Sequence, residues 1–324
     1  MEDDYLDAMY EYTPSSRNLR DAVERIVLSA EQELWDGHSS RLKEETIEEL
    51  EQVRSLAIRI AYEGKVDDPD LWYYTAAFID HLLGHNFYAS LLLEKAESSK
   101  GSKFIKESVK VLKIYLDALG PYNNSYESKM LNGVKWLEIM VIEHLDEGLS
   151  ATISNGIYYT SINQSYFYWN DMLRKIVHSG IVPRLLESNK DALAIAYSNM
   201  ADNLIFNLVG EIDLSWSSSQ RMTIQEYREA GDFNDIDYSN MTFGLLDSIR
   251  VESIVRYVEN LRKPDNDMFQ YLNSKGYTDE DFFCDIIGTR MIREMRYSEA
   301  EAWLAKVSPS FQNQLNTFRD GYLS

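Results

Sequence analysis

The sequence has one cysteine, Cys284, among its 324 residues. A single cysteine cannot form an intramolecular disulfide, and it cannot supply the several thiolates of a cysteine-based zinc site. Cytosolic proteins fit this composition, and so do exported proteins that use no disulfides. Cysteine content therefore leaves the compartment undecided.

Long apolar runs are absent as well, because Lys, Glu or Asp interrupts the hydrophobic stretches. No window approaches the roughly 18 apolar residues that a membrane-spanning helix needs. Residues 1–12 carry five acidic side chains and no basic one, the opposite of the start of a signal peptide. We expect a soluble protein that is not embedded in a membrane, exported only if a leader has been removed from its start.

Positive charge is scarce. The chain has 32 Lys and Arg against 53 Asp and Glu, a net charge of −21. This balance repels phosphate backbones and anionic lipid surfaces, so we expect no nucleic acid partner.

Apolar residues, in contrast, make up 44% of the chain and recur every three or four positions. This period is typical of amphipathic helices and predicts an all-α fold. A chain of this length exceeds what one core usually serves, which favours two domains or an elongated array. The predicted helical segments include residues 16–37, 42–62, 71–83, 88–97, 126–145, 188–209 and 245–261.

The pattern divides the chain into four parts. Residues 1–15 are predicted to be an acidic, flexible N-terminus, and residues 16–210 a helical-repeat array. Helical periodicity fails over residues 211–243, apart from one short helix at 223–229, so this part is predicted to be an irregular loop. Residues 244–324 are predicted to be a C-terminal helical repeat.

The most clearly specified segment is residues 278–307, which predicts two helices joined at Arg296-Tyr297 with almost no loop. Thr278 with Asp281, and Ser298 with Glu301, have the spacing of capping boxes at the two helix starts. Only residues 308–324 follow this hairpin, so the tail must cap it or its apolar end must make a contact with another copy.

Small and large residues alternate at the spacing of a helical hairpin in two segments. The first has Ala77, Gly84, Ala89, Leu93 and Ala96, and the second has Ile287, Gly288, Met291, Tyr297, Ala300, Leu304 and Val307. Both series resemble the tetratricopeptide repeat (TPR), whose period is about 34 residues. This resemblance implies irregular antiparallel hairpins stacked as a TPR-like α-α superhelix.

Four positions depart from the repeat. Asp80 stands where an aromatic residue is usual, Cys284 where tryptophan is usual, Met295 where glycine is usual and Gln312 where proline is usual. The chain also resembles large helical-repeat proteins of Bacteroidetes, through FYASLLLEKAE (87–97), YSNMADN (197–203) and IIGTRMIREMRYSEA (286–300). Those relatives are usually longer and often exported, which implies that this chain could be part of a longer one.

The TPR resemblance implies a concave groove lined by the first helix of each hairpin. The corresponding positions are Tyr74, Phe78 and His81 in the early hairpin, and Phe282, Asp285, Thr289 and Arg293 in the late one. The Lys and Asn pattern that holds a peptide carboxylate in some TPR proteins is missing. We therefore expect a non-enzymatic scaffold or protein- or peptide-binding module, with a homo-oligomer through an uncapped end as a further outcome.

No pattern of catalytic, cofactor-binding or metal-binding residues is apparent. His81 and His85 are four residues apart, but no third ligand accompanies them. An acidic stretch at 232–237 fails as a calcium loop, because Ile236 and Asp237 occupy positions that need a ligand and a glycine. We expect no enzyme activity and no cofactor.

Two residue groups leave alternatives open. Tyr158, Tyr166 and Trp169 lie in an aromatic stretch that could stack on sugar rings, which would make the protein an exported or surface glycan-binding protein, or could pack between helices. Lys103, Lys106, Lys110 and Lys113 share one helical face, which could be a solvated surface or a local site for an anion or partner.

Overall fold

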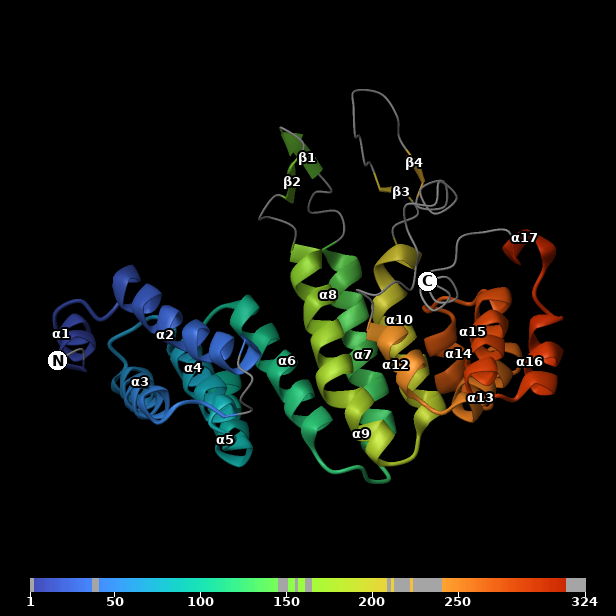
Figure 1. Ribbon diagram of the computed structural model, residues 1–324. Coiled ribbons are helices and arrows are strands. Elements are labelled where there is room, and N and C mark those ends of the chain that lie inside the picture. Colours follow the sequence, from blue (N-terminus) through green and yellow to red (C-terminus); the bar gives the residue numbers. More distant parts are fainter. Residues whose placement is uncertain are drawn as a thin grey trace. The chain divides into compact units, whose positions relative to one another are not determined.

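The structure is a computed structural model (Figure 1). It describes residues 3–36, 41–144, 151–154, 157–160, 165–208, 211–212, 222–223 and 241–312. The fold is all-α, as predicted, with two short antiparallel strand pairs. Contacts divide the chain into two compact units, residues 1–116 and residues 117–324. The predicted array at 16–210 therefore falls into two units.

The first unit is built from antiparallel helices around one apolar core. Its helices are α1 (Asp3–Tyr12), α2 (Arg17–Asp36), α3 (Glu44–Glu63), α4 (Pro69–Leu82), α5 (Asn86–Ser98) and α6 (Lys103–Leu119), the last of which runs three residues into the second unit. The core is formed by small and branched side chains together with Trp72. Helix α4 packs extensively against both α3 and α5, whereas α2 contacts α3 over a shorter stretch.

The second unit contains the remaining elements. They are α7 (Tyr126–Glu143), β1 (Ala151–Ser154), β2 (Ile157–Thr160), α8 (Ser165–Ile176), a π-helical turn (Val177–Ile181), α9 (Val182–Glu187), α10 (Asp191–Leu208), β3 (Glu211–Ile212), β4 (Met222–Thr223), α12 (Met241–Ser248), α13 (Val251–Arg262), α14 (Asp267–Asn273), α15 (Glu280–Arg293), α16 (Tyr297–Leu304) and α17 (Pro309–Gln312). Most of the predicted loop at 211–243, including nearly all of its short helix, lies outside the described residues.

The N-terminus is not the flexible segment that its charge predicted. Tyr10 of α1 is fully buried, and its hydroxyl donates a hydrogen bond to Glu63 Oε2 at 2.8 Å. Burial and this carboxylate raise the pKa of Tyr10 to about 12. Asp7 pairs with Arg59, so opposite charges on α3 hold the acidic helix in place. The prediction is wrong because one aromatic anchor outweighs the repulsion within an acidic segment.

Three connections between helices share one turn geometry. Gly84, Asn189 and Met295 have left-handed backbones, with φ of 79°, 55° and 60°. In each case this residue and the next donate their amides back to the preceding helix, as in a Schellman motif. The bonds are Gly84 N to His81 O, His85 N to Asp80 O, Asn189 N to Leu186 O, Lys190 N to Leu185 O, Met295 N to Ile292 O and Arg296 N to Met291 O, all between 2.7 and 3.0 Å.

The helix that follows each turn begins in the same way. Five residues after the left-handed residue stands an alanine, Ala89, Ala194 or Ala300, and each is buried. Each turn is separated from the next by about 105 residues, which is close to three periods of 34 residues. The α9–α10 hairpin is thus a third copy of the local pattern. Sequence comparison missed it because Asn189 replaces the glycine and a serine, Ser198, replaces the large residue nine positions after the turn.

The α15–α16 hairpin has the predicted boundaries within a few residues. A Cβ atom on Gly288 would lie 2.5 Å from Leu304 Cγ, so the glycine allows the two helices to approach closely. Both predicted capping boxes are wrong. Asp279 rather than Thr278 caps α15, accepting from Asp281 N at 2.9 Å, and the residue before α16 makes no side-chain cap hydrogen bond.

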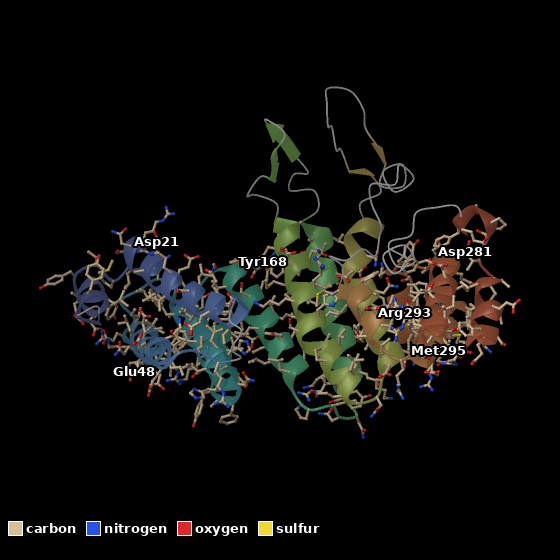
Figure 2. The ribbon with its side chains drawn as sticks, viewed as in Figure 1. Asp21, Glu48, Tyr168, Asp281, Arg293 and Met295 are labelled. Carbon is tan, nitrogen blue, oxygen red and sulfur yellow. The ribbon has the colours of Figure 1, made fainter. Side chains whose placement is uncertain are left out.

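The chain after this hairpin turns back onto α15. Ser308 N donates to Asp281 Oδ1 at 3.1 Å, and the Ser308 hydroxyl donates to the other carboxylate oxygen. Phe311 of α17 is buried. Asp281 and Met295 mark the two ends of α15 in Figure 2. The start of the tail therefore covers part of the hairpin, while residues 313–324 lie outside the described residues.

Candidate functional site

The early half of the predicted concave groove forms a row of aromatic rings in the first unit. Tyr74 and Phe78 stack with ring centroids 6.4 Å apart, and His81 follows at 6.2 Å from Phe78. His81 also meets Tyr115 of α6 edge-on at 5.2 Å. These side chains are half-buried, and Tyr74 and Phe78 pack on the core.

Two of the four residues of the late half are buried. Phe282 is 8% exposed and Asp285 is 3% exposed, so the prediction that they line an open groove is wrong. Phe282 packs edge-on against Tyr277 and Phe283. Thr289 is half-buried, and Arg293 forms an ion pair with Asp247 at 2.7 Å. These positions were implied by the TPR resemblance, which does not show whether other parts of the chain cover that face of α15.

Trp169, one of the three residues predicted to stack on sugars, does not lie at the surface. This side chain is 1% exposed, and its ring contacts Trp136, His144 and Tyr168 at centroid distances of 6.0, 5.9 and 5.1 Å. The glycan role is therefore wrong for Trp169, whose alternative role in helix packing is confirmed. Tyr158 lies in β2 and Tyr166 in α8, but their side chains lie outside what the structure describes.

The lysine face of α6 is largely engaged in local contacts. Lys106 Nζ donates to Ala96 O and Glu97 O at 2.5 and 2.9 Å, and so caps the carboxyl end of α5. Lys113 pairs with Glu97. Lys103 pairs with Glu107 at 3.4 Å. These contacts favour a structural role over a site for an anion.

Each histidine of the His81–His85 pair contacts a neighbouring side chain. His81 Nδ1 lies 3.1 Å from Asn86 Oδ1, and His85 Nδ1 lies 3.5 Å from the buried carboxylate of Asp80. Arg54 Nε approaches the same carboxylate to 2.6 Å, so an opposite charge accompanies this buried acid. Within the described part of the chain, no three His, Cys, Asp or Glu side chains gather around a common point.

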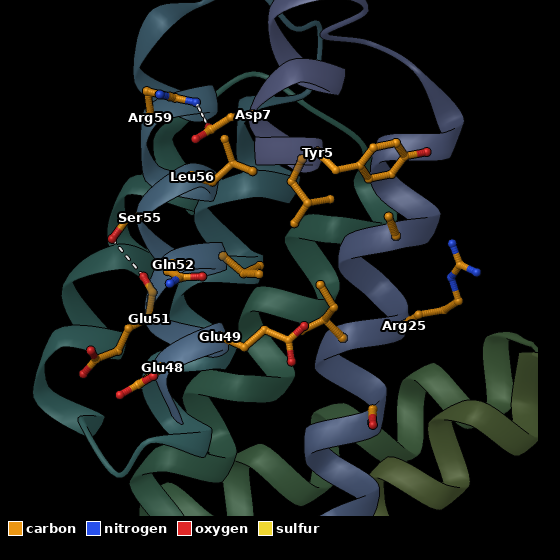
Figure 3. A pocket seen from close by; sticks show the side chains of 15 residues that line it. Tyr5, Asp7, Arg25, Glu48, Glu49, Glu51, Gln52, Ser55, Leu56 and Arg59 are labelled. Atoms are coloured by element: carbon orange, nitrogen blue, oxygen red, sulfur yellow. Dashed lines mark hydrogen bonds and ion pairs between the residues drawn. The ribbon is translucent and has the colours of Figure 1, made fainter. Parts of the chain in front are cut away.

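A groove of about 1030 Å³ opens between α1, α2 and α3 of the first unit (Figure 3). Figure 2 also labels Asp21 on α2 and Glu48 on α3, the two helices that form its long walls. We call it the α1–α2–α3 groove. Its lining residues are Tyr5, Leu6, Asp7, Ala22, Arg25, Ile26, Ser29, Glu48, Glu49, Glu51, Gln52, Val53, Ser55, Leu56 and Arg59.

The groove combines an apolar floor with an acidic wall. Val53 and Leu56 are buried, and Leu6 and Ile26 are half-buried and pack on the core. Glutamates follow one another along α3 at the rim. Tyr5, which is 62% exposed, lies at the end of the groove closed by α1.

The two arginines of the lining do not neutralise this wall. Arg59 pairs with Asp7 across the α1–α3 contact. Arg25 points away from the groove in Figure 3, and its Nε donates to the backbone oxygen of Asp21 at 3.2 Å. Glu48 and Glu51 have no ion pair with any residue that the structure describes. The groove therefore carries a surplus of negative charge.

Sequence reasoning missed this groove. The signal was present in the glutamates of EETIEELE (44–51). However, the N-terminus was expected to be flexible, and it supplies the closed end of the groove. Periodicity also could not show that α2 and α3 diverge.

In the second unit, a buried polar network surrounds α10. Asp202 Oδ1 accepts from His178 Nε2 at 2.9 Å and from Arg174 Nε at 3.1 Å, and its Oδ2 accepts from both Thr242 N and Thr242 Oγ1. Ser198 Oγ lies 2.8 Å from Thr242 Oγ1. The carboxylate thus binds the first turn of α12 to α10.

A second part of the network joins α10 to the connection before α15. Asn199 Nδ2 donates to Tyr257 Oη at 2.7 Å and to Tyr277 O at 2.8 Å, and its Oδ1 accepts from Tyr277 N. A Cβ atom on Gly276 would lie 2.8 Å from Asn199 Nδ2, so glycine is needed for this approach. The segment YSNMADN (197–203) therefore supplies buried polar side chains that connect α10 to neighbouring elements.

Burial alone would raise the pKa of Asp202, but hydrogen bonds and charge from His178, together with the bonds from Thr242, hold it below its ordinary value. The carboxylate is ionised and fully engaged. Although Ser198, His178 and Asp202 are residue types found in hydrolases, His178 binds Asp202 whereas the Ser198 hydroxyl contacts Thr242 in the interior.

No family model, curated protein or solved structure matches the chain. Among the described helices, none is both long enough and apolar enough to cross a bilayer.

Proposed function

We propose that the protein is a non-enzymatic module that binds a protein or peptide partner in the α1–α2–α3 groove. The observation that carries this proposal is the groove itself. It is open, it holds about 1030 Å³, and it places apolar side chains beneath a charged rim. This combination is typical of grooves that accept a segment of another chain.

The proposal includes a TPR-like arrangement of the hairpins. Three features support it: the shared left-handed turns at Gly84, Asn189 and Met295, the buried alanine five residues after each, and the spacing between them. Binding rather than catalysis is supported by the buried network at Asp202, in which the reactive groups hold helices together.

The test is a selection of peptides from a display library against the full chain. Ser29 is exposed and lies on the α2 wall, so Ser29→Trp fills part of the groove without disturbing the core. Ser90→Trp is the matched control, because Ser90 is exposed on α5 and lies outside the lining. Selected peptides should bind the parent protein and Ser90→Trp equally, and Ser29→Trp at least tenfold more weakly.

Two results would contradict the proposal. One is a selection that yields no binding peptide. The other is a set of peptides that bind Ser29→Trp as tightly as they bind Ser90→Trp. Thermal unfolding of both variants shows whether a loss of binding reflects a blocked groove or a loss of folding.

A further inference from the structure

We infer that the partner of the α1–α2–α3 groove is an amphipathic helix with lysine or arginine residues beside its apolar face. This inference rests on the proposed function and names the chemistry of the partner. It follows from the size of the groove, from its floor and from the charge along α3.

The length of the groove suits a short helix. Its lining runs from Glu48 to Arg59 on α3 and from Ala22 to Ser29 on α2. At 1.5 Å per residue these stretches are about 16 and 11 Å long, or two to three helical turns. A helix of three turns with side chains occupies on the order of 1,300 Å³. The groove can therefore hold most of such a helix while its outer face stays in solvent.

The floor supplies an apolar surface for one side of that helix. Ile26 from α2 and Leu56 from α3 lie on opposite walls, with Leu6 from α1 at the closed end. An amphipathic helix presents apolar residues at positions i, i+3, i+4 and i+7, which form a stripe along one face. That stripe matches a floor formed by side chains from three elements.

The charge of α3 is the observation that identifies the partner. Glu44, Glu45, Glu48, Glu49 and Glu51 place like charges three or four residues apart, and each such pair costs a few tenths of a kcal/mol in an isolated helix. The helix dipole favours the two glutamates of the first turn, but its effect fades beyond that turn. Glu48 and Glu51 lie beyond that turn, and neither forms an ion pair with a described residue that would offset their repulsion.

A cationic partner relieves this repulsion. In Figure 3 the side chain of Glu49 extends from α3 across the groove toward α2, where it would meet a bound helix. Glu48 and Glu51 also line the groove, and in Figure 3 their side chains lie on the other side of α3 from that of Glu49. A lysine or arginine at the edge of the bound apolar face would therefore lie in the negative field of this wall. A second copy of this chain, with a net charge of −21, would add further repulsion.

The experiment compares two synthetic helical peptides of about 14 residues. One has leucines at helical spacing flanked by lysines, and the other has glutamate in place of each lysine. Fluorescence anisotropy measures their binding to the full chain at low salt and at about 0.15 M salt. The lysine peptide should bind at least tenfold more tightly, and its advantage should shrink as salt rises.

Paired charge variants locate the effect. The double variant Glu48→Gln/Glu51→Gln should weaken binding of the lysine peptide at least threefold. The control Glu24→Gln/Glu94→Gln removes the same charge from exposed positions outside the groove and should leave binding nearly unchanged. The groove double variant should also unfold at a higher temperature, because it removes repulsion within α3.

The outcomes separate this inference from the proposed function. If both peptides bind equally and Ser29→Trp abolishes both, the groove is a binding site but the cationic partner is wrong. If neither peptide binds, or if Ser29→Trp has no effect on the lysine peptide, the inference fails. In that event the library selection alone decides whether the groove binds another class of peptide.

Discussion

Met295 adopts the same left-handed backbone conformation between α15 and α16 that Gly84 adopts between α4 and α5, with φ of 60° and 79°. Both residues donate their amides three residues back, to Ile292 O and His81 O. Glycine reaches this conformation without a steric cost, whereas a residue with a Cβ atom does not. The geometry of the turn is therefore retained at position 295 at the expense of local strain.

Met295→Gly should raise the free energy of unfolding by about 0.5–1 kcal/mol, because glycine removes the strain and the methionine side chain is 76% exposed. Urea unfolding measures the change. Met295→Ala is the control, since it removes the side chain but keeps the Cβ atom. Equal stability of the two variants would show that the backbone is not strained at this position.

Gly288→Val should lower the free energy of unfolding by about 1–3 kcal/mol, because the new side chain would overlap Leu304 where α15 and α16 meet. Chemical denaturation followed by circular dichroism gives this value. The matched variant is Gly244→Val in α12, where a Cβ atom would have no neighbour within 4 Å. If the two variants lose the same stability, helix propensity explains the loss and close packing does not.

Asp202→Asn should destabilise the second unit most strongly at neutral pH. The pKa of Asp202 is lowered in the folded protein, so its contribution is present above the ordinary value of about 3.9 and is lost as pH falls through the lower folded value. The stability difference between parent and variant should therefore shrink below about pH 4. Unfolding free energies measured from pH 3 to pH 7 test this, with the exposed Asp265→Asn as the control.

Asp70→Asn should behave in the opposite way. Burial raises the pKa of Asp70, and Lys106 Nζ stays 4.0 Å from its carboxylate. The cost of burying the charge is absent below about pH 4 and grows as pH rises through the folded pKa. The variant should therefore gain stability relative to the parent protein between pH 4 and pH 7. The neighbouring Asp67 is exposed, so Asp67→Asn should show no such trend.

Helix positions could be read from the sequence because they depend on local information. Apolar residues at three- and four-residue spacing specify a helix and its buried face, and backbone hydrogen bonds stay within the segment. The α15–α16 hairpin was located in this way. The resemblance to TPR hairpins also marked Gly84 as the turn, where the backbone has a positive φ.

The choice of neighbours depended on contacts between distant parts of the chain. Periodicity shows which face of a helix is apolar, but not which helix covers it. For this reason Phe282 and Asp285 were expected to line a groove and are buried, and the two alternatives for Trp169 could not be separated before the structure showed it buried. The same reason explains why Asp202 could not be paired with Thr242 from sequence, since 40 residues separate them.

The α1–α2–α3 groove shows both kinds of information in one place. The glutamates along α3 are visible in the sequence, and their helical spacing puts them on a shared surface. The groove exists because Tyr10 is buried and Asp7 pairs with Arg59, which together dock α1 against α3. Local spacing sets the charge of each helix face, whereas the packing of side chains from separate helices sets whether that face borders a groove or lies against solvent.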